Sequence, residues 1–72
     1  MTKFDKKLFA ERLKESVEKS GMTLAEISKK TGIAQHTFQK YFEGETIPRC
    51  NNFRRICIVL CVRADYLLAI DA

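Results

Sequence analysis

In the first part of the chain, apolar residues recur among polar ones with the spacing of an amphipathic helix. The apolar positions near one helical face are Leu8, Phe9, Leu13 and Val17. Asp5 is a good N-cap, Phe4 is placed to pack on Phe9, and Gly21 suits a left-handed C-cap. The pattern predicts a helix of about four turns between Asp5 and Gly21.

Local signals at both ends predict a second, shorter helix. Thr23 and Glu26 have the spacing of a capping box, in which each side chain accepts a hydrogen bond from the other residue's backbone N–H. Met22 and Ile27 flank this box as a hydrophobic staple, and Gly32 ends the helix.

A third helix is expected from about Gln35 to Glu43, with Gly44 as its cap. Its apolar residues share one side at i, i+3, i+4 spacing: Phe38, Tyr41 and Phe42. The opposite side carries polar residues: Gln35, His36, Gln39 and Lys40. Two short helices joined by a tight turn at Gly32 have the build of a helix-turn-helix motif, here over about residues 23–43.

A fourth helix is expected to begin near residues 49–51. Its apolar stripe repeats at helical spacing and contains Cys50, Phe53, Ile56, Cys57 and Leu60. After a break at 61–63, a fifth helix is expected from Ala64 to Ile70, with Leu67 facing inward. No linker, repeat or low-complexity tract appears, so we expect a single domain over residues 1–72. The predicted fold class is all-α, with five helices in a compact arrangement.

The composition agrees with one small basic domain. The 72 residues are 46% apolar, carry a net charge of +4 and include three glycines and one proline, which favours a compact helical chain. The positive charge suits a polyanion such as DNA, although many small domains are equally basic. No apolar run approaches the roughly 20 residues that span a bilayer, and no signal peptide is visible. We expect a cytoplasmic protein without a membrane partner.

The three cysteines, Cys50, Cys57 and Cys61, have the spacing of a buried helical stripe rather than of a metal knuckle. Their odd number agrees with a reducing compartment. We expect all three to be reduced, metal-free and largely buried. His36 is the single histidine and has neither metal-binding partners at recognisable spacing nor a nucleophile beside it. No metal, cofactor or catalytic residue is expected, and an enzyme is the least favoured function class.

These features together resemble the XRE-type family, the Cro and lambda-repressor-like DNA-binding domains. The resemblance runs from about Phe9 to Leu68, and its elements are residues 11–14, 21–23, 25–27 and 31–33, together with Gly44, Pro48, Val62, Asp65 and Leu67. Each element alone is weak, whereas their order and spacing together are specific. The resemblance implies a five-helix lambda-repressor-like domain with the helix-turn-helix on its second and third helices.

The chain departs from this family at several positions. Leu24 stands where family members usually carry a Gln that helps to grip a backbone phosphate, and Ala34 stands where a small hydroxyl residue usually caps the third helix. A glycine is common at the position of Cys61. Val17 and Phe42 replace an Arg and a Glu that often form a buried ion pair, so we expect these two apolar side chains to pack together.

The exposed side of the third helix is the expected base-reading surface: Gln35, His36, Gln39 and Lys40. Gln can bond N6 and N7 of adenine, and Lys can donate to O6 and N7 of guanine. The family resemblance implies base contacts by Gln35, His36 and Lys40 in particular; a merely solvated helix face is the alternative. The side chains expected to contact phosphates are Thr23, Thr37, Thr46, Arg49 and Asn51. Four further basic residues have two alternative roles, phosphate contact or ordinary solubilising charge: Lys29, Lys30, Arg54 and Arg55.

We therefore expect a non-enzymatic, sequence-specific binder of double-stranded DNA, a small transcriptional regulator of phage or bacterial type. Repression by occupying an operator is the expected mode, and activation is equally compatible with the sequence. The operator is expected to be an inverted repeat bound by a homodimer that pairs, at least on DNA, through Tyr66, Leu68 and Ile70. The main alternative is a protein-interaction module on the same fold, such as an antitoxin or an adaptor.

Overall fold

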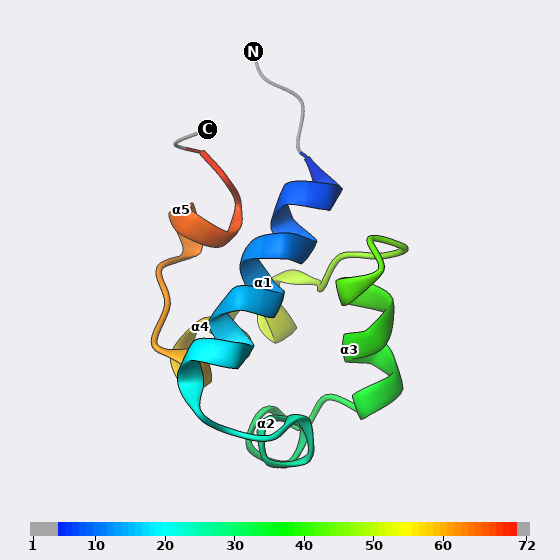
Figure 1. Cartoon of the computed structure of the whole chain (residues 1–72), viewed down its shortest axis with the longest axis vertical. Helices are drawn as coiled ribbons and strands as arrows, with labels where there is room; N and C mark the ends of the chain where they lie inside the picture. The colour runs from blue at the N-terminus through cyan, green and yellow to red at the C-terminus, as the bar shows by residue number, and fades with distance from the viewer. Residues whose placement is uncertain (1–4, 71–72) are drawn as a thin grey trace.

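The computed structural model describes residues 5–70, which fold into five α-helices without a strand (Figure 1). They are α1 (Lys6–Ser20), α2 (Leu24–Thr31), α3 (Gln35–Phe42), α4 (Cys50–Leu60) and α5 (Ala64–Leu67). The all-α prediction is confirmed, and four of the helices begin and end close to their predicted bounds. No helix of this part of the chain has the length and apolar character needed to cross a membrane.

One small core holds the helices together. Helix α1 contacts α3, α4 and α5, while α2 packs on α3 and α4. The apolar side chains buried between them are Phe9, Leu13, Ile27, Ile33, Phe38, Tyr41, Ile56, Leu60 and Leu67. Val17 and Phe42 are both half-buried against this core, as expected for the residues that replace an ion pair, and their direct contact stays a prediction.

Local chemistry sets the start and end of α1. The Asp5 carboxylate accepts hydrogen bonds from the backbone N–H groups of Lys7 and Leu8, at 3.0 and 3.1 Å. Gly21 follows the helix with φ +74°, a conformation that costs glycine little because it has no Cβ. Both caps were predicted. The proposed staple from Phe4 to Phe9 lies outside the described residues.

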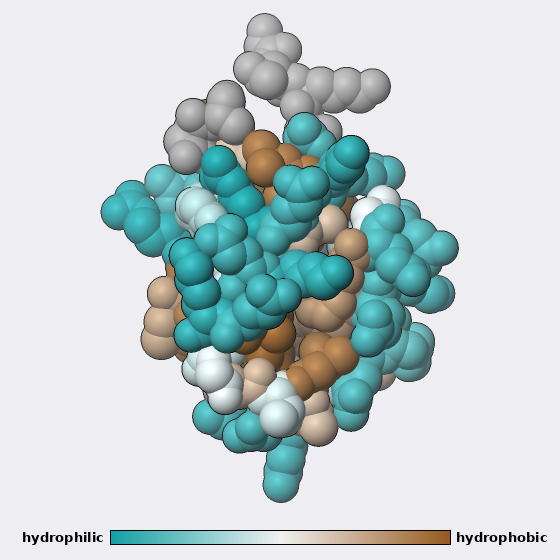
Figure 2. Space-filling model, viewed as in Figure 1, coloured by the Kyte–Doolittle hydropathy of each residue, from teal (hydrophilic) through white to brown (hydrophobic). Residues whose placement is uncertain are grey.

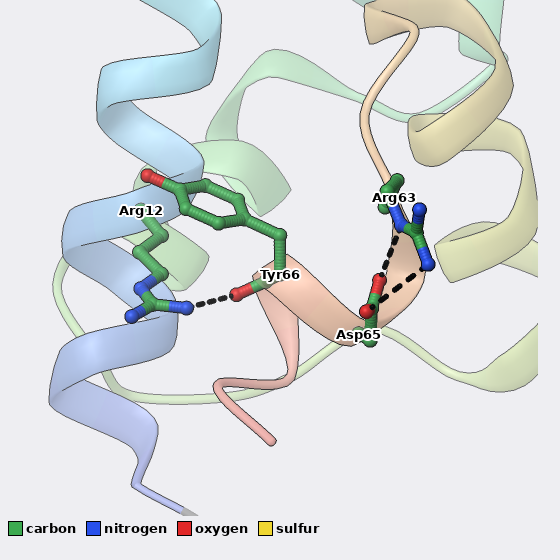
Figure 3. Close-up of polar contacts among 4 residues, drawn as sticks. All are labelled: Arg12, Arg63, Asp65 and Tyr66. Atoms are coloured by element: carbon green, nitrogen blue, oxygen red, sulfur yellow. Dashed lines mark hydrogen bonds and ion pairs between the residues drawn. The ribbon is translucent and has the colours of Figure 1, made fainter. Parts of the chain in front are cut away.

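Helix α5 is attached to α1 by a partly buried arginine (Figure 3). Nη1 of Arg12 donates to the backbone carbonyl of Tyr66 at 2.7 Å, and the guanidinium carbon lies 4.5 Å from the centre of the Tyr66 ring. The Tyr66 hydroxyl contacts Oε2 of Glu15 at 3.4 Å. On the outer side of the same short helix, Arg63 pairs with Asp65 at 3.0 Å.

The predicted extent of the fifth helix was wrong. The helix ends at Leu67 rather than Ile70, because Ala69 takes a left-handed conformation with φ +58°. The N–H of Ala69 then donates to the Tyr66 carbonyl, and that of Ile70 donates to the Asp65 carbonyl. These bonds satisfy the last carbonyls of the helix as a Schellman motif does, so the chain turns away after one helical turn.

The expectation of three buried cysteines was also wrong. Cys50 and Cys61 are exposed, and Cys57 is half-buried. Cys50 is the first residue of α4 and Cys61 is its left-handed cap, so both lie beyond the stretch that Ile56 and Leu60 bury against the core. All three thiols are free. Burial raises the pKa of the Cys57 thiol above its usual value.

Candidate nucleic-acid interface

The helix-turn-helix begins with the capping box that the sequence predicts. The Thr23 hydroxyl accepts from the backbone N–H of Glu26 at 3.2 Å, and the Glu26 carboxylate accepts from the backbone N–H of Thr23 at 3.1 Å. The Glu26 carboxylate also accepts from the Thr23 hydroxyl at 3.2 Å, and the two hydrogen bonds that it accepts from Thr23, first from the backbone N–H and then from the hydroxyl, lower the pKa of Glu26. The start of α2 is therefore fixed, and its remaining backbone N–H groups point outward at the positive end of the helix dipole.

The turn between α2 and α3 is held by two hydroxyl side chains, Ser28 and Thr31, for which the sequence pattern indicates no such role. Gly32 has φ +75°, and its N–H donates to the Ser28 carbonyl at 2.9 Å. The Ser28 hydroxyl donates to the Ile33 carbonyl. The Thr31 hydroxyl donates to the Ile27 carbonyl at 2.8 Å and accepts from the Ile33 N–H at 3.2 Å. The buried Ile33 side chain then anchors the turn in the core, which fixes the angle between the two helices.

Helix α3 is divided sharply into an inner and an outer side. Phe38 and Tyr41 are buried and their rings meet edge to face, with centroids 5.7 Å apart. All four predicted base-reading residues are exposed on the outer side: Gln35, His36, Gln39 and Lys40. Hydrophilic side chains cover the edge of the molecule over α3, and apolar side chains show between α1 and α3 (Figure 2). The exposed polar face is thus carried by a helix that the core holds in place.

The start of α3 is less firmly fixed than that of α2. Ala34 occupies the N-cap position with φ −62° and ψ 147°, and no side chain caps the helix. Only the Ala34 carbonyl takes part, accepting from the N–H groups of Thr37 and Phe38 at 3.1 and 3.3 Å. Helix α3 therefore lacks a side-chain cap, as Ala34 at this position of the sequence indicates.

The candidate phosphate contacts lie on both flanks of α3. Thr23 is exposed at the start of α2, while Thr46 and Arg49 are exposed in the loop between α3 and α4. Asn51 is exposed in the first turn of α4, where its side chain accepts from the Asn52 N–H at 3.0 Å. Thr37 differs from these because it is half-buried on α3. Leu24 packs against the core, so it cannot replace the phosphate-binding Gln of the resembled family.

A further basic residue, Arg55, lies beside the turn. The sequence alone did not decide its role. A Cβ atom on Gly32 would lie 3.7 Å from Nη1 of Arg55, so the guanidinium of this α4 residue reaches the end of α2. A positive group is favourable there because the carbonyl end of a helix carries partial negative charge. Arg55 therefore lies beside the turn, a position that only the packing of α4 against α2 reveals.

The described residues contain no cluster of three His, Cys, Asp or Glu side chains that could hold a metal ion. His36 stands apart from the cysteines, which lie on or at the end of α4. The geometry of α3 thus presents hydrogen-bonding groups to a surface rather than to an enclosed site.

No protein-family model matches the chain, and no curated protein matches it. Among solved structures, the chain is similar to the solution structure of a protein described as the SOS-response transcriptional repressor LexA from Eubacterium rectale. The identity is 28% with a TM-score of 0.79, and the match covers 93% of this chain and 73% of the other. The chain therefore has the all-helical helix-turn-helix fold of that repressor structure.

Proposed function

We propose that this chain is a sequence-specific domain that binds double-stranded DNA and reads the major groove with α3. The observation that carries the proposal is the exposure of Gln35, His36, Gln39 and Lys40 on the outer side of α3, whose inner side is buried in the core. A helix of this size fits the major groove, where each base pair shows a distinct pattern of donors and acceptors. The similarity to a transcriptional repressor supports the same function.

The side-chain chemistry allows two kinds of base contact. The Gln35 amide both donates and accepts, as adenine N7 and N6 require, and the Lys40 ammonium donates to guanine O6 and N7. Gln35 and Lys40 are five residues apart, so their Cα atoms are separated by about 7.5 Å along the helix axis. This distance corresponds to roughly two base-pair steps. Gln35 and Lys40 are therefore assigned to different base pairs, with His36 beside Gln35 and Gln39 between them.

Phosphate contacts from both flanks would hold α3 in register. Thr23 brings the positive end of α2 to one strand, while Thr46, Arg49 and Asn51 approach the backbone beyond the other end of α3. Thr37 is retained as a weaker candidate because it is half-buried. These contacts carry no sequence information directly, and they give binding its dependence on salt.

We assign a homodimer as the DNA-bound form, joined through the C-terminal end. Leu68 and Ile70 are exposed there, at 36% and 70% of their surface. Leu68 also lines an apolar groove of about 260 Å³, together with Phe9, Ile47, Pro48, Cys50 and Phe53. A two-fold pair with two copies of α3 about 34 Å apart would match an inverted-repeat operator. In this assignment the chain is a regulator of the XRE, Cro and lambda-repressor-like type, acts in a phage or bacterial cytoplasm, and represses by occupying its operator.

Selection of bound sequences from a random duplex library tests the function directly. We expect enrichment of an inverted repeat, and affinity that falls steeply with salt because bound phosphates release condensed counterions. Absence of duplex binding even at low salt would contradict the proposal. It would favour the alternative, a protein-interaction module that uses the same outer face of α3.

A further inference from the structure

We propose that Lys6 and Lys7 form a second phosphate-binding surface, which extends the DNA contact from the loop after α3 onto the start of α1. The proposal rests on the proposed function and deepens it. A groove of about 480 Å³ joins the two segments, and its lining residues are Lys6, Lys7, Ala10, Glu11, Phe42, Glu43 and Gly44. The first turn of α1 and the loop after α3 lie toward the same end of the molecule (Figure 1).

This groove is continuous with the expected path of a DNA strand. Thr46 follows Gly44 by two residues, which is at most about 7 Å of extended chain. A phosphate backbone that passes Thr46 and Arg49 therefore comes within a short distance of the groove. The next basic side chains on that path are Lys6 and Lys7, although they are nearly forty residues away in sequence.

The two lysines are free to bind an anion. Both are exposed, and neither forms an ion pair with any residue in the described range 5–70. The loop itself carries two carboxylates, Glu43 and Glu45, and Glu11 adds a third from α1. Without Lys6 and Lys7 a phosphate at this end of the site would meet only these carboxylates, and the two lysines offset two of the three negative charges while being the basic side chains that line the groove.

Stability does not explain why lysine occupies these positions. Lys6 and Lys7 stand in the first turn of a 15-residue helix that has no acidic residue in that turn. Cations at the N-terminal end of a helix oppose its dipole, so the placement is unfavourable for α1 itself. Residues that break a local rule in this way are often retained for function.

The test compares DNA binding by the parent with that of the double variant Lys6→Gln and Lys7→Gln across salt concentrations. Glutamine keeps a similar helix propensity, and removing cations from this helix end should not weaken folding. The control is Lys14→Gln, which removes an exposed cation from the same helix beyond the groove, whereas Lys19 is avoided because it pairs with Glu15 at 2.7 Å. Circular dichroism checks that each variant folds.

We expect the slope of log affinity against log salt to fall by about one to two units in the Lys6 and Lys7 variant. Its loss of affinity relative to the parent should be similar on selected and random duplexes, and the control should keep the parent's slope. Replacing single phosphates by uncharged methylphosphonates should identify one or two positions that weaken the parent and leave the variant unchanged.

An unchanged slope in the Lys6 and Lys7 variant, or an equal fall in the control, would overturn this inference while leaving the proposed function intact. A parent protein that binds no duplex at low salt would overturn both.

Discussion

Arg12 and Tyr66 are 54 residues apart in sequence and form the main polar link between α1 and α5, through a 2.7 Å hydrogen bond and a guanidinium 4.5 Å from the ring centre. We predict that Arg12→Ala lowers the free energy of unfolding by about 1–2 kcal/mol, because it removes a charged donor and a cation–π contact. Tyr66→Phe should cost less than about 0.5 kcal/mol, since it keeps both interactions and loses only the long hydroxyl contact. Urea denaturation of the two variants tests this, and equal stabilities would contradict it.

Ala34 is a cap position that lacks a capping side chain. Its backbone already has the extended conformation that N-cap residues adopt, so Ala34→Ser should stabilise the protein by about 1 kcal/mol. Ala34→Val is the matched control, because valine cannot accept the hydrogen bond and should give no gain. The midpoint temperature of thermal unfolding compares the two variants with the parent. A serine variant that unfolds at the same temperature as the parent would show that α3 needs no cap.

Cys61 holds a left-handed conformation, with φ 56° and ψ 42°, that strains any residue with a Cβ. Cys61→Gly should therefore stabilise the fold by about 1 kcal/mol. Cys61→Ala keeps the Cβ and its strain, so it should leave stability close to that of the parent. A glycine variant no more stable than the alanine variant in urea denaturation would count against the strain.

The three thiols should react at different rates in the folded protein. Cys50 and Cys61 are exposed and should be labelled quickly, whereas Cys57 is half-buried. Burial also raises the pKa of Cys57, so a smaller fraction of this thiol is the reactive thiolate at about pH 8. Mass spectrometry after timed alkylation should show two fast sites and one slow site, and all three should be fast in denaturant. Equal native rates would contradict the structure.

The sequence predicted best what depends on near neighbours. The capping box joins Thr23 to Glu26, and the caps at Asp5 and Gly32 act within one turn of their own helix, so residue types alone indicate them. The exposed side of α3 was equally predictable, because the period of Phe38 and Tyr41 fixes the opposite side.

The errors and omissions came from features that no local sequence pattern indicates. The stripe from Cys50 to Cys61 has the correct period, but residues at a helix end have fewer neighbours and stay exposed. The apolar run after Leu67 contains no glycine to announce the left-handed turn at Ala69. The link between Arg12 and Tyr66 joins distant segments, so no local pattern could indicate it.

The central claim is that α3 reads bases while the loop after it holds phosphates. Gln35→Ala should cost about 1–3 kcal/mol of binding on the selected site and relax selectivity at one base pair. Arg49→Ala and Thr46→Ala should weaken binding to selected and random duplexes alike, because phosphates are common to both. Of these two, Arg49→Ala should also reduce the salt slope by about one unit.

The most direct measurement is the ratio of affinities for the selected and random duplexes, determined for the parent, Gln35→Ala, Lys40→Ala and Arg49→Ala under one salt condition. Each variant must first show the parent's circular dichroism spectrum, since α3 also carries the buried Phe38 and Tyr41. The account predicts that both substitutions lower this ratio while Arg49→Ala leaves it unchanged. If both α3 variants fold normally and keep the parent's ratio, α3 does not read the DNA sequence.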